Sequence, residues 1–228
     1  YDGVYRGTYL LCEKVEVRSG LLDIVDYDEL IERTFDTDGL TVATGENRYG
    51  CPYSYLAGLD ADSGAQGAYL LEIDEYFYTG EDAWVSTKSG LHFTVQNPGY
   101  LSEADGAYIG EFLQRIENAI ENGGVEPDTG EKASDLLDYD SLARFFLLSE
   151  WSKNPDYWRG STFFNKPAGE EKLYTGPVWD FDIAFGIRKG ESGTTGFLRS
   201  DDGWLGGLTA LPGFQEAVRA VWQNEMEP

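Results

Sequence analysis

The stretch PVWDFDIAFG, residues 177–186, decides how the rest of this chain is interpreted. It places two carboxylates, Asp180 and Asp182, in an otherwise apolar run between a proline and a glycine. If it forms a strand, its side chains alternate, so both carboxylates share one face with Cα atoms about 6 to 7 Å apart. That spacing suits Mg²⁺, which prefers one or two carboxylates together with phosphate oxygens. The alternative is that one Asp caps a turn while the other pairs with Arg188 or Lys189, because a buried charge needs a partner.

A second polar segment lies a short hairpin upstream. The run EWSKNPDYWRGSTFFNK, residues 150–166, predicts a helix end, a polar loop that carries Asp156, and then a strand. A loop Asp, a hairpin and a later Asp follow one another in kinases, where the first accepts a hydroxyl proton and the second holds the metal. An Asn stands five residues after the first Asp in that layout, and Ser161 occupies the position here. The alternative is a simple helix-ending turn, which Asn-Pro-Asp favours by itself.

Composition narrows the function classes. The chain has 228 residues with 41 acidic and 17 basic side chains, a formal net charge of −24. Such a charge repels nucleic acid and anionic membranes. It suits either a protein that must stay soluble or one that attracts cations or basic polypeptides. No apolar run reaches the length of a membrane span. The single histidine, His92, excludes a His-rich zinc site, and the two cysteines leave a Cys12–Cys51 disulfide open.

The order of the expected elements indicates the fold class. Strands are expected first and helices later, which favours an α+β fold over βαβ repeats. In the first half the patterns predict strands at 7–17, 67–77 and 91–98, a helix at 25–35 capped by Asp26 or Asp28, and loops over 36–67. In the second half they predict a helix from Ser102 to Asn122 with a Ser102–Asp105 capping box, a helix capped by Asp140, strands at 161–166 and 172–182, a loop at 186–207, and a last helix near Pro212.

The ordered set of motifs resembles the CotH kinase family, the atypical protein kinases named after a spore-coat protein. Single pieces are weak, but their order and the WDFD ending are specific, and they cover nearly the whole chain. The motifs are YRGTYLLCEKVEV, GAYLLEIDEYF, FTVQNP, LLSEWSKNPD with STFFNK, GPVWDFDIAFG and LPGFQEAVRAVWQ.

The resemblance implies an atypical protein-kinase-like fold in a single domain over residues 1–228. A β-rich part (1–100) would precede a helical part (101–228) with a catalytic loop and a short hairpin that carries the active-site acids. It also implies transfer of the ATP γ-phosphate to Ser of a protein, with Mg²⁺ (or Mn²⁺ or Ca²⁺) as the metal. An extracellular, cell-surface or spore-surface location follows from the same resemblance. The acidic charge of the chain suits a basic, Ser-rich substrate segment by charge complementarity, and the oligomeric state stays open.

Motif by motif, the resemblance assigns Asp156 and Asp180 as the catalytic acids. It adds Asp182 to these two as a metal ligand, since Asp182 matches the second acid of the family's WDxD pattern. The predicted nucleotide-binding positions are Glu13, Lys14 and Ser161. If 7–17 is a strand, Glu13 and Lys14 point to opposite faces, and Glu13 is the one we expect to face the site.

One family feature is not found in the sequence. Members normally carry an earlier basic segment of the R-G-N-S and K-K-x-Y type, so we expect this chain to be N-terminally incomplete. Two alternatives to a kinase follow: a non-catalytic cell-surface or adhesion module that keeps the fold, and a metal-dependent hydrolase that uses the same acids. A kinase should bind ATP with Mg²⁺, whereas the non-catalytic module should not. A hydrolase should release free phosphate without an acceptor protein.

Overall fold

The apolar patterns around residues 70 and 95 form the middle of an antiparallel sheet. The computed structural model describes residues 14–59, 67–74, 83–188, 195–198 and 203–227. The elements in chain order are α1 (Tyr27–Thr34), β1 (Thr41–Glu46), β2 (Pro52–Ala57), β3 (Tyr69–Ile73), β4 (Trp84–Ser86), β5 (His92–Asn97), α2 (Glu103–Glu121), α3 (Ala133–Leu136), α4 (Tyr139–Ser152), β6 (Thr162–Lys166), β7 (Tyr174–Thr175), α5 (Gly203–Ala210), α6 (Pro212–Val221) and the π-helical turn η2 (Trp222–Met226). This mixture confirms the α+β class.

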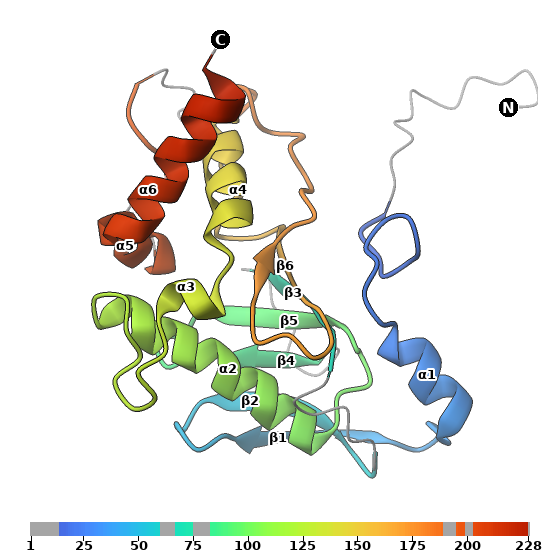
Figure 1. Ribbon diagram of the computed structural model, residues 1–228. Coiled ribbons are helices and arrows are strands. Elements are labelled where there is room, and N and C mark those ends of the chain that lie inside the picture. Colours follow the sequence, from blue (N-terminus) through green and yellow to red (C-terminus); the bar gives the residue numbers. More distant parts are fainter. Residues whose placement is uncertain (1–13, 60–66, 75–82, 189–194, 199–202, 228) are drawn as a thin grey trace, which may run out of the picture.

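The sheet joins strands from both halves of the chain. Within the described residues the sheet has seven strands in the order β1-β2-β4-β5-β3-β6-β7, and each neighbouring pair is antiparallel. Helix α2 runs across one face of the sheet. Helices α4, α5 and α6 lie together above the sheet in the view of Figure 1, where α4 contacts β7. Because β3 lies between β5 and β6, the end of β3 is brought beside the segment that precedes β6.

Helix α2 forms where its sequence pattern predicts it. The Ser102 side chain accepts a hydrogen bond from the backbone N–H of Asp105 and donates one to the Asp105 carboxylate at 2.7 Å. This confirms Ser102 as the N-cap residue. The Asp105 carboxylate accepts from the Ser102 hydroxyl group, whereas in a standard capping box the N3 side chain accepts from the backbone N–H of the N-cap residue. The apolar face is buried as expected, and its members are Ile109, Phe112, Leu113, Ile116 and Ile120.

Two other helix predictions are confirmed and one is wrong. Helix α1 is capped by Asp26, and α6 begins at Pro212. Helix α4 is capped by Asp138, whose carboxylate accepts from the N–H of Ser141, and not by Asp140. Asp140 lies inside the first turn, where it is paired with the Arg144 side chain one turn later.

Several strand predictions need correction. Residues 36–67 contain the β1–β2 hairpin and not only loops, and 84–86 form the additional strand β4. Strand β1 was missed because it is an exposed edge strand, TVATGE, with no buried apolar face. In 172–182 only Tyr174 and Thr175 form a strand, and α5 begins inside the expected loop 186–207. Most of the strand predicted at 7–17 lies outside the described residues.

The β6–β7 hairpin separates the two predicted active-site loops. Phe164 pairs with Thr175 and Asn165 with Tyr174. The loop that carries Asp156 leads into β6, and the segment that carries Asp180 leaves β7. The acids therefore flank the hairpin predicted from the family resemblance and do not lie on its strands.

His92 gives the fold a pH dependence that can be measured. Burial lowers the pKa of this imidazole from 6.5 to about 4, and its Nδ1 lies 2.7 Å from the Ser86 hydroxyl across the β4–β5 pair. Between pH 6.5 and pH 4 the unfolded chain binds a proton that the folded chain does not, so this contribution to stability falls as the pH falls. Solvent screening at this half-buried ring reduces the effect to about 1 to 2 kcal/mol.

We expect His92→Gln to remove that part of the pH dependence. Urea denaturation at pH 7.5 and pH 4.5 measures it as the loss of unfolding free energy in each protein. The wild-type chain should lose more stability on acidification than the variant. Equal losses would show that the imidazole takes up its proton as readily in the folded chain as in the unfolded chain, so that burial does not lower its pKa.

Candidate active site

A cleft of about 440 Å³ opens between the end of β3 and the two loops that flank the hairpin. The residues that line it are Glu72, Asp74, Asp156, Arg159, Gly160, Ser161, Asp180 and Arg188. Three positions predicted from sequence, Asp156, Ser161 and Asp180, thus come together in one site. Four carboxylates and two guanidinium groups face the same space.

Asn154 holds the two predicted catalytic acids in place. Its side chain is buried, with Oδ1 accepting from the N–H of Asp156 at 3.2 Å and Nδ2 donating to the carbonyl of Asp180 at 3.3 Å. One amide group therefore joins the backbones of both loops. The Asp156 loop is also anchored in the core by the next two residues, Tyr157 and Trp158, which are both buried.

Ser161 links the same two loops through its hydroxyl group, which donates to Asp180 Oδ2 at 3.2 Å. The left-handed backbone is concentrated here: among the described residues, every non-glycine position with positive φ lies between residues 153 and 185. These positions are Lys153, Trp158, Ser161, Asp180 and Phe185. Such conformations are unfavourable for residues with a Cβ atom and occur preferentially at functional sites, where the surroundings enforce them.

The prediction that Asp180 and Asp182 share one face of a strand is wrong. The strand ends at Thr175, and the left-handed backbone of Asp180, with φ of 56°, breaks the alternation. Asp180 enters the cleft, whereas Asp182 is exposed in the turn that follows and is not among the cleft-lining residues. The role of Asp182 as a metal ligand stays a prediction.

The ion pair considered for Arg188 forms with a different acid. Its Nη1 lies 3.7 Å from Asp156 Oδ1, so the segment after Asp180 reaches back to the first loop.

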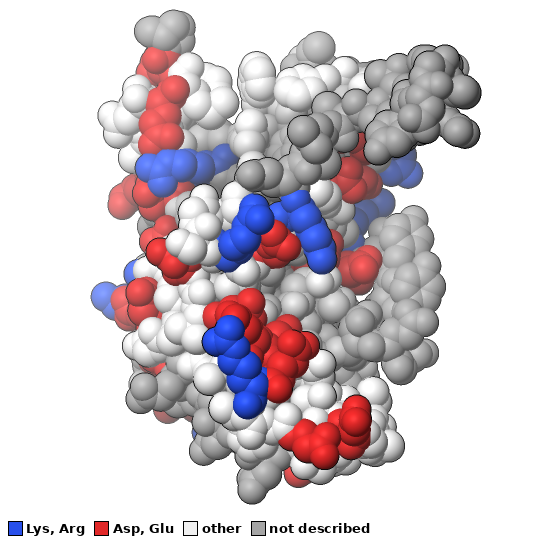
Figure 2. Space-filling view, turned by 90° about the vertical axis from the view of Figure 1, so that its right-hand side faces the viewer, with Lys and Arg blue, Asp and Glu red and all other residues white. Residues whose placement is uncertain are grey.

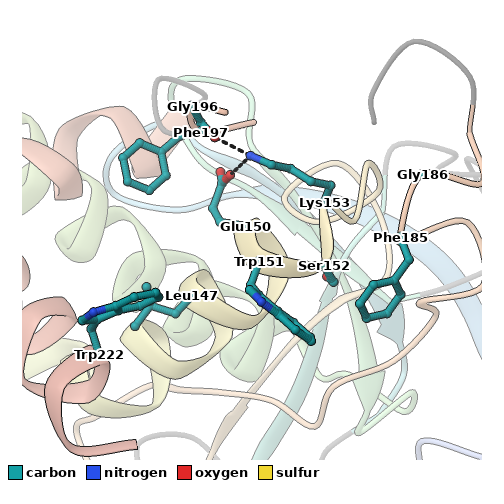
Figure 3. A pocket seen from close by; sticks show the side chains of 10 residues that line it. All are labelled: Leu147, Glu150, Trp151, Ser152, Lys153, Phe185, Gly186, Gly196, Phe197 and Trp222. Carbon is teal, nitrogen blue, oxygen red and sulfur yellow. Dashed lines mark hydrogen bonds and ion pairs between the residues drawn. The ribbon is translucent and has the colours of Figure 1, made fainter. Parts of the chain in front are cut away.

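The turn after Asp180 is anchored to the end of α4 as well. The Phe185 N–H donates to the Ser152 carbonyl at 2.6 Å, and the Phe185 ring packs edge-on against Trp151 with centroids 5.5 Å apart. Figure 3 shows these aromatic side chains in a groove of about 720 Å³ that adjoins the start of the Asp156 loop. Among the residues that line this groove, Lys153 pairs with the buried carboxylate of Glu150 at 3.6 Å and donates to the Gly196 carbonyl.

Glu72 is a cleft residue that the motif analysis did not identify. It lies on β3, paired with Phe163 of β6. Burial raises its pKa to about 7, the negative charges of Asp74 and Asp180 act in the same direction, and hydrogen bonds from Gln96 and the Ser161 backbone oppose them. The signal in the sequence was an acid pair two residues apart at a strand end, the same spacing as in WDFD.

The nucleotide-binding predictions near the N-terminus are not tested by this geometry. Glu13 lies outside the described residues. Lys14 is exposed and does not line the cleft. Within the described part of the chain, no group of three or more His, Cys, Asp or Glu side chains is arranged to hold a metal ion by itself. A cation here would draw on one or two carboxylates and on ligand oxygens, as Mg²⁺ does in kinase sites.

A protein-family model described as CotH kinase protein matches residues 1–227. The chain belongs to the CotH kinase family. No curated protein and no solved structure matches it. The resemblance inferred from the ordered motifs is therefore confirmed for essentially the whole CotH chain, and family membership points to a kinase-like domain.

Asn154→Ala tests the bridge between the loops. The substitution leaves the Asp180 carbonyl and the Asp156 N–H without this partner, and we expect a loss of about 1 to 3 kcal/mol in unfolding free energy. Hydrogen–deuterium exchange of peptides covering 178–187 should also become faster.

Asn165→Ala is the matched control, because Asn165 also donates to a backbone carbonyl, that of Gly176, at 3.1 Å. It should leave exchange in 178–187 near the wild-type rate. If both variants accelerate exchange equally, Asn154 has no special role in joining the loops.

Proposed function

We propose that this CotH-family chain is a metal-dependent protein kinase domain that transfers the ATP γ-phosphate to Ser of a protein substrate. The observation that supports the proposal is the convergence of Asp156 and Asp180 from two loops on one cleft, with Ser161 bonded to Asp180. A loop Asp followed by a later, metal-holding Asp is the order of acids that kinases use in phosphoryl transfer. The kinase-like fold is part of the same proposal.

In this proposal Asp180 holds the divalent cation, which neutralises charge on the phosphates. The acidic side chains of the cleft and their half-burial fit a hard cation that also binds phosphate oxygens. Asp156 accepts the proton of the substrate hydroxyl as the Ser Oγ–P bond forms and the bond from the γ-phosphorus to the β,γ-bridging oxygen breaks. Asn154 and Ser161 hold the loops of Asp156 and Asp180 in fixed positions relative to each other.

The substrate in this proposal is a basic, Ser-rich segment. The formal net charge of −24 favours association with a cationic partner. Figure 2 shows one face on which acidic side chains lie in groups with Lys and Arg, so the charge is not a uniform coat. No described helix is long and apolar enough to cross a membrane. An extracellular, cell-surface or spore-surface location remains part of the proposal.

Asp180→Ala tests the reaction. With Mg²⁺ or Mn²⁺, the wild-type chain should transfer labelled γ-phosphate to a basic Ser-rich peptide. Loss of the metal-holding acid should lower the rate at least about 100-fold, because positioning and charge neutralisation supply nearly all of the catalysis. Asp140→Ala is the control, since Asp140 is an exposed acid on α4 outside the cleft.

Transfer that survives Asp180→Ala would contradict the assigned role. Absence of any heat on mixing the wild-type chain with ATP and Mg²⁺ would favour the non-catalytic surface module. Release of free phosphate without an acceptor would favour the hydrolase.

A further inference from the structure

The carboxylates of the cleft are unfavourable for binding the negatively charged phosphates of a nucleotide. Four carboxylates line the cleft, and each repels the phosphates of a nucleotide. In well-known kinases a lysine meets the phosphates beside the metal. Among the described residues that line this cleft there is no lysine, and the basic side chains are Arg159 and Arg188.

Both arginines contact Asp156, but they come from different loops. Arg159 follows Asp156 by three residues, and its N–H donates to the Asp156 carbonyl at 3.0 Å, which fixes its backbone in the loop. Arg188 comes from the segment after Asp180, in the other loop. The two guanidinium groups therefore enter the same cleft from two different loops.

The ion pair between Arg188 and Asp156 is weak enough for another anion to replace the carboxylate. Its Nη1 is 3.7 Å from Asp156 Oδ1, longer than a hydrogen bond, and its side chain is 52% exposed. Exposed ion pairs of this kind contribute little to stability, so a competing anion replaces the carboxylate readily. A guanidinium also binds phosphate through two parallel N–H bonds, which a lysine does not offer.

We propose that Arg159 and Arg188 bind the phosphates of the nucleotide in this cleft, and that Arg188 moves from Asp156 to the phosphates when the nucleotide binds. This rests on the proposed kinase function and deepens it, because it assigns the basic groups that neither the motifs nor the family match identified. Arg188 then holds Asp156 in an ion pair while the cleft is empty. Nucleotide binding releases the Asp156 carboxylate for the substrate hydroxyl.

The test is calorimetric titration of the chain with ATP and with pyrophosphate, each in the presence of Mg²⁺. Arg159→Gln and Arg188→Gln should each raise the Kd for both probes at least about tenfold, since each removes a charge-assisted contact. The Lys variants keep the charge without the fork, so Arg188→Lys and Arg159→Lys should fall between the wild type and the Gln variants.

Arg33→Gln is the matched control. Arg33 is an exposed arginine on α1 that pairs with Glu29 and does not line the cleft, so its loss should leave both Kd values unchanged. Urea denaturation checks that every variant is folded. The dependence of Kd on salt should also be weaker in the Gln variants, because fewer charges meet the phosphates.

The outcomes separate this inference from the proposed function. Binding by the wild type that both Gln variants retain at full strength overturns the arginine assignment alone. An equal loss in Arg33→Gln also overturns it, because the effect would then come from net charge and not from the cleft. Absence of heat from the wild type with either probe overturns the proposed kinase function and this inference together.

Discussion

The site depends on one amide side chain. Asn154 accepts from the N–H of Asp156 and donates to the carbonyl of Asp180, so one buried group sets the distance between two loops that are otherwise separated by a hairpin. Because it bonds main-chain atoms, it fixes the acids without occupying their carboxylates. Those carboxylates stay available to meet Ser161, Arg188 and a ligand.

The sheet supplies the second constraint. Strand β3 is formed early in the chain but pairs with β6 from the second half, with Ile73 opposite Thr162. This pairing carries Glu72 to the cleft, where burial and two neighbouring acids raise its pKa to about 7. The same low-dielectric, acid-rich surroundings explain why basic groups are needed if the cleft is to hold phosphate.

Much of the fold followed from local patterns. The cap and apolar face of α2, the start of α6 at Pro212 and the strands around 70 and 95 were predicted, because each depends on residues a few positions apart. The edge strand β1 was not predicted, since an exposed edge strand lacks a buried face to mark it. The α4 cap was placed two residues late because both Asp138 and Asp140 are suitable capping residues.

The sequence alone determined the family and the order of the two loops that carry Asp156 and Asp180, and it predicted that Asp156, Ser161 and Asp180 belong to one site. These features are written in short motifs and their spacing. Only the tertiary structure decided that Asp180 lines the cleft while Asp182 is exposed outside it, and that Arg188 pairs with Asp156. The physical reason is that a strand's alternation holds only while its ladder continues. Past Thr175 the path of the chain is set by distant contacts, above all those with Asn154, Ser161 and Ser152.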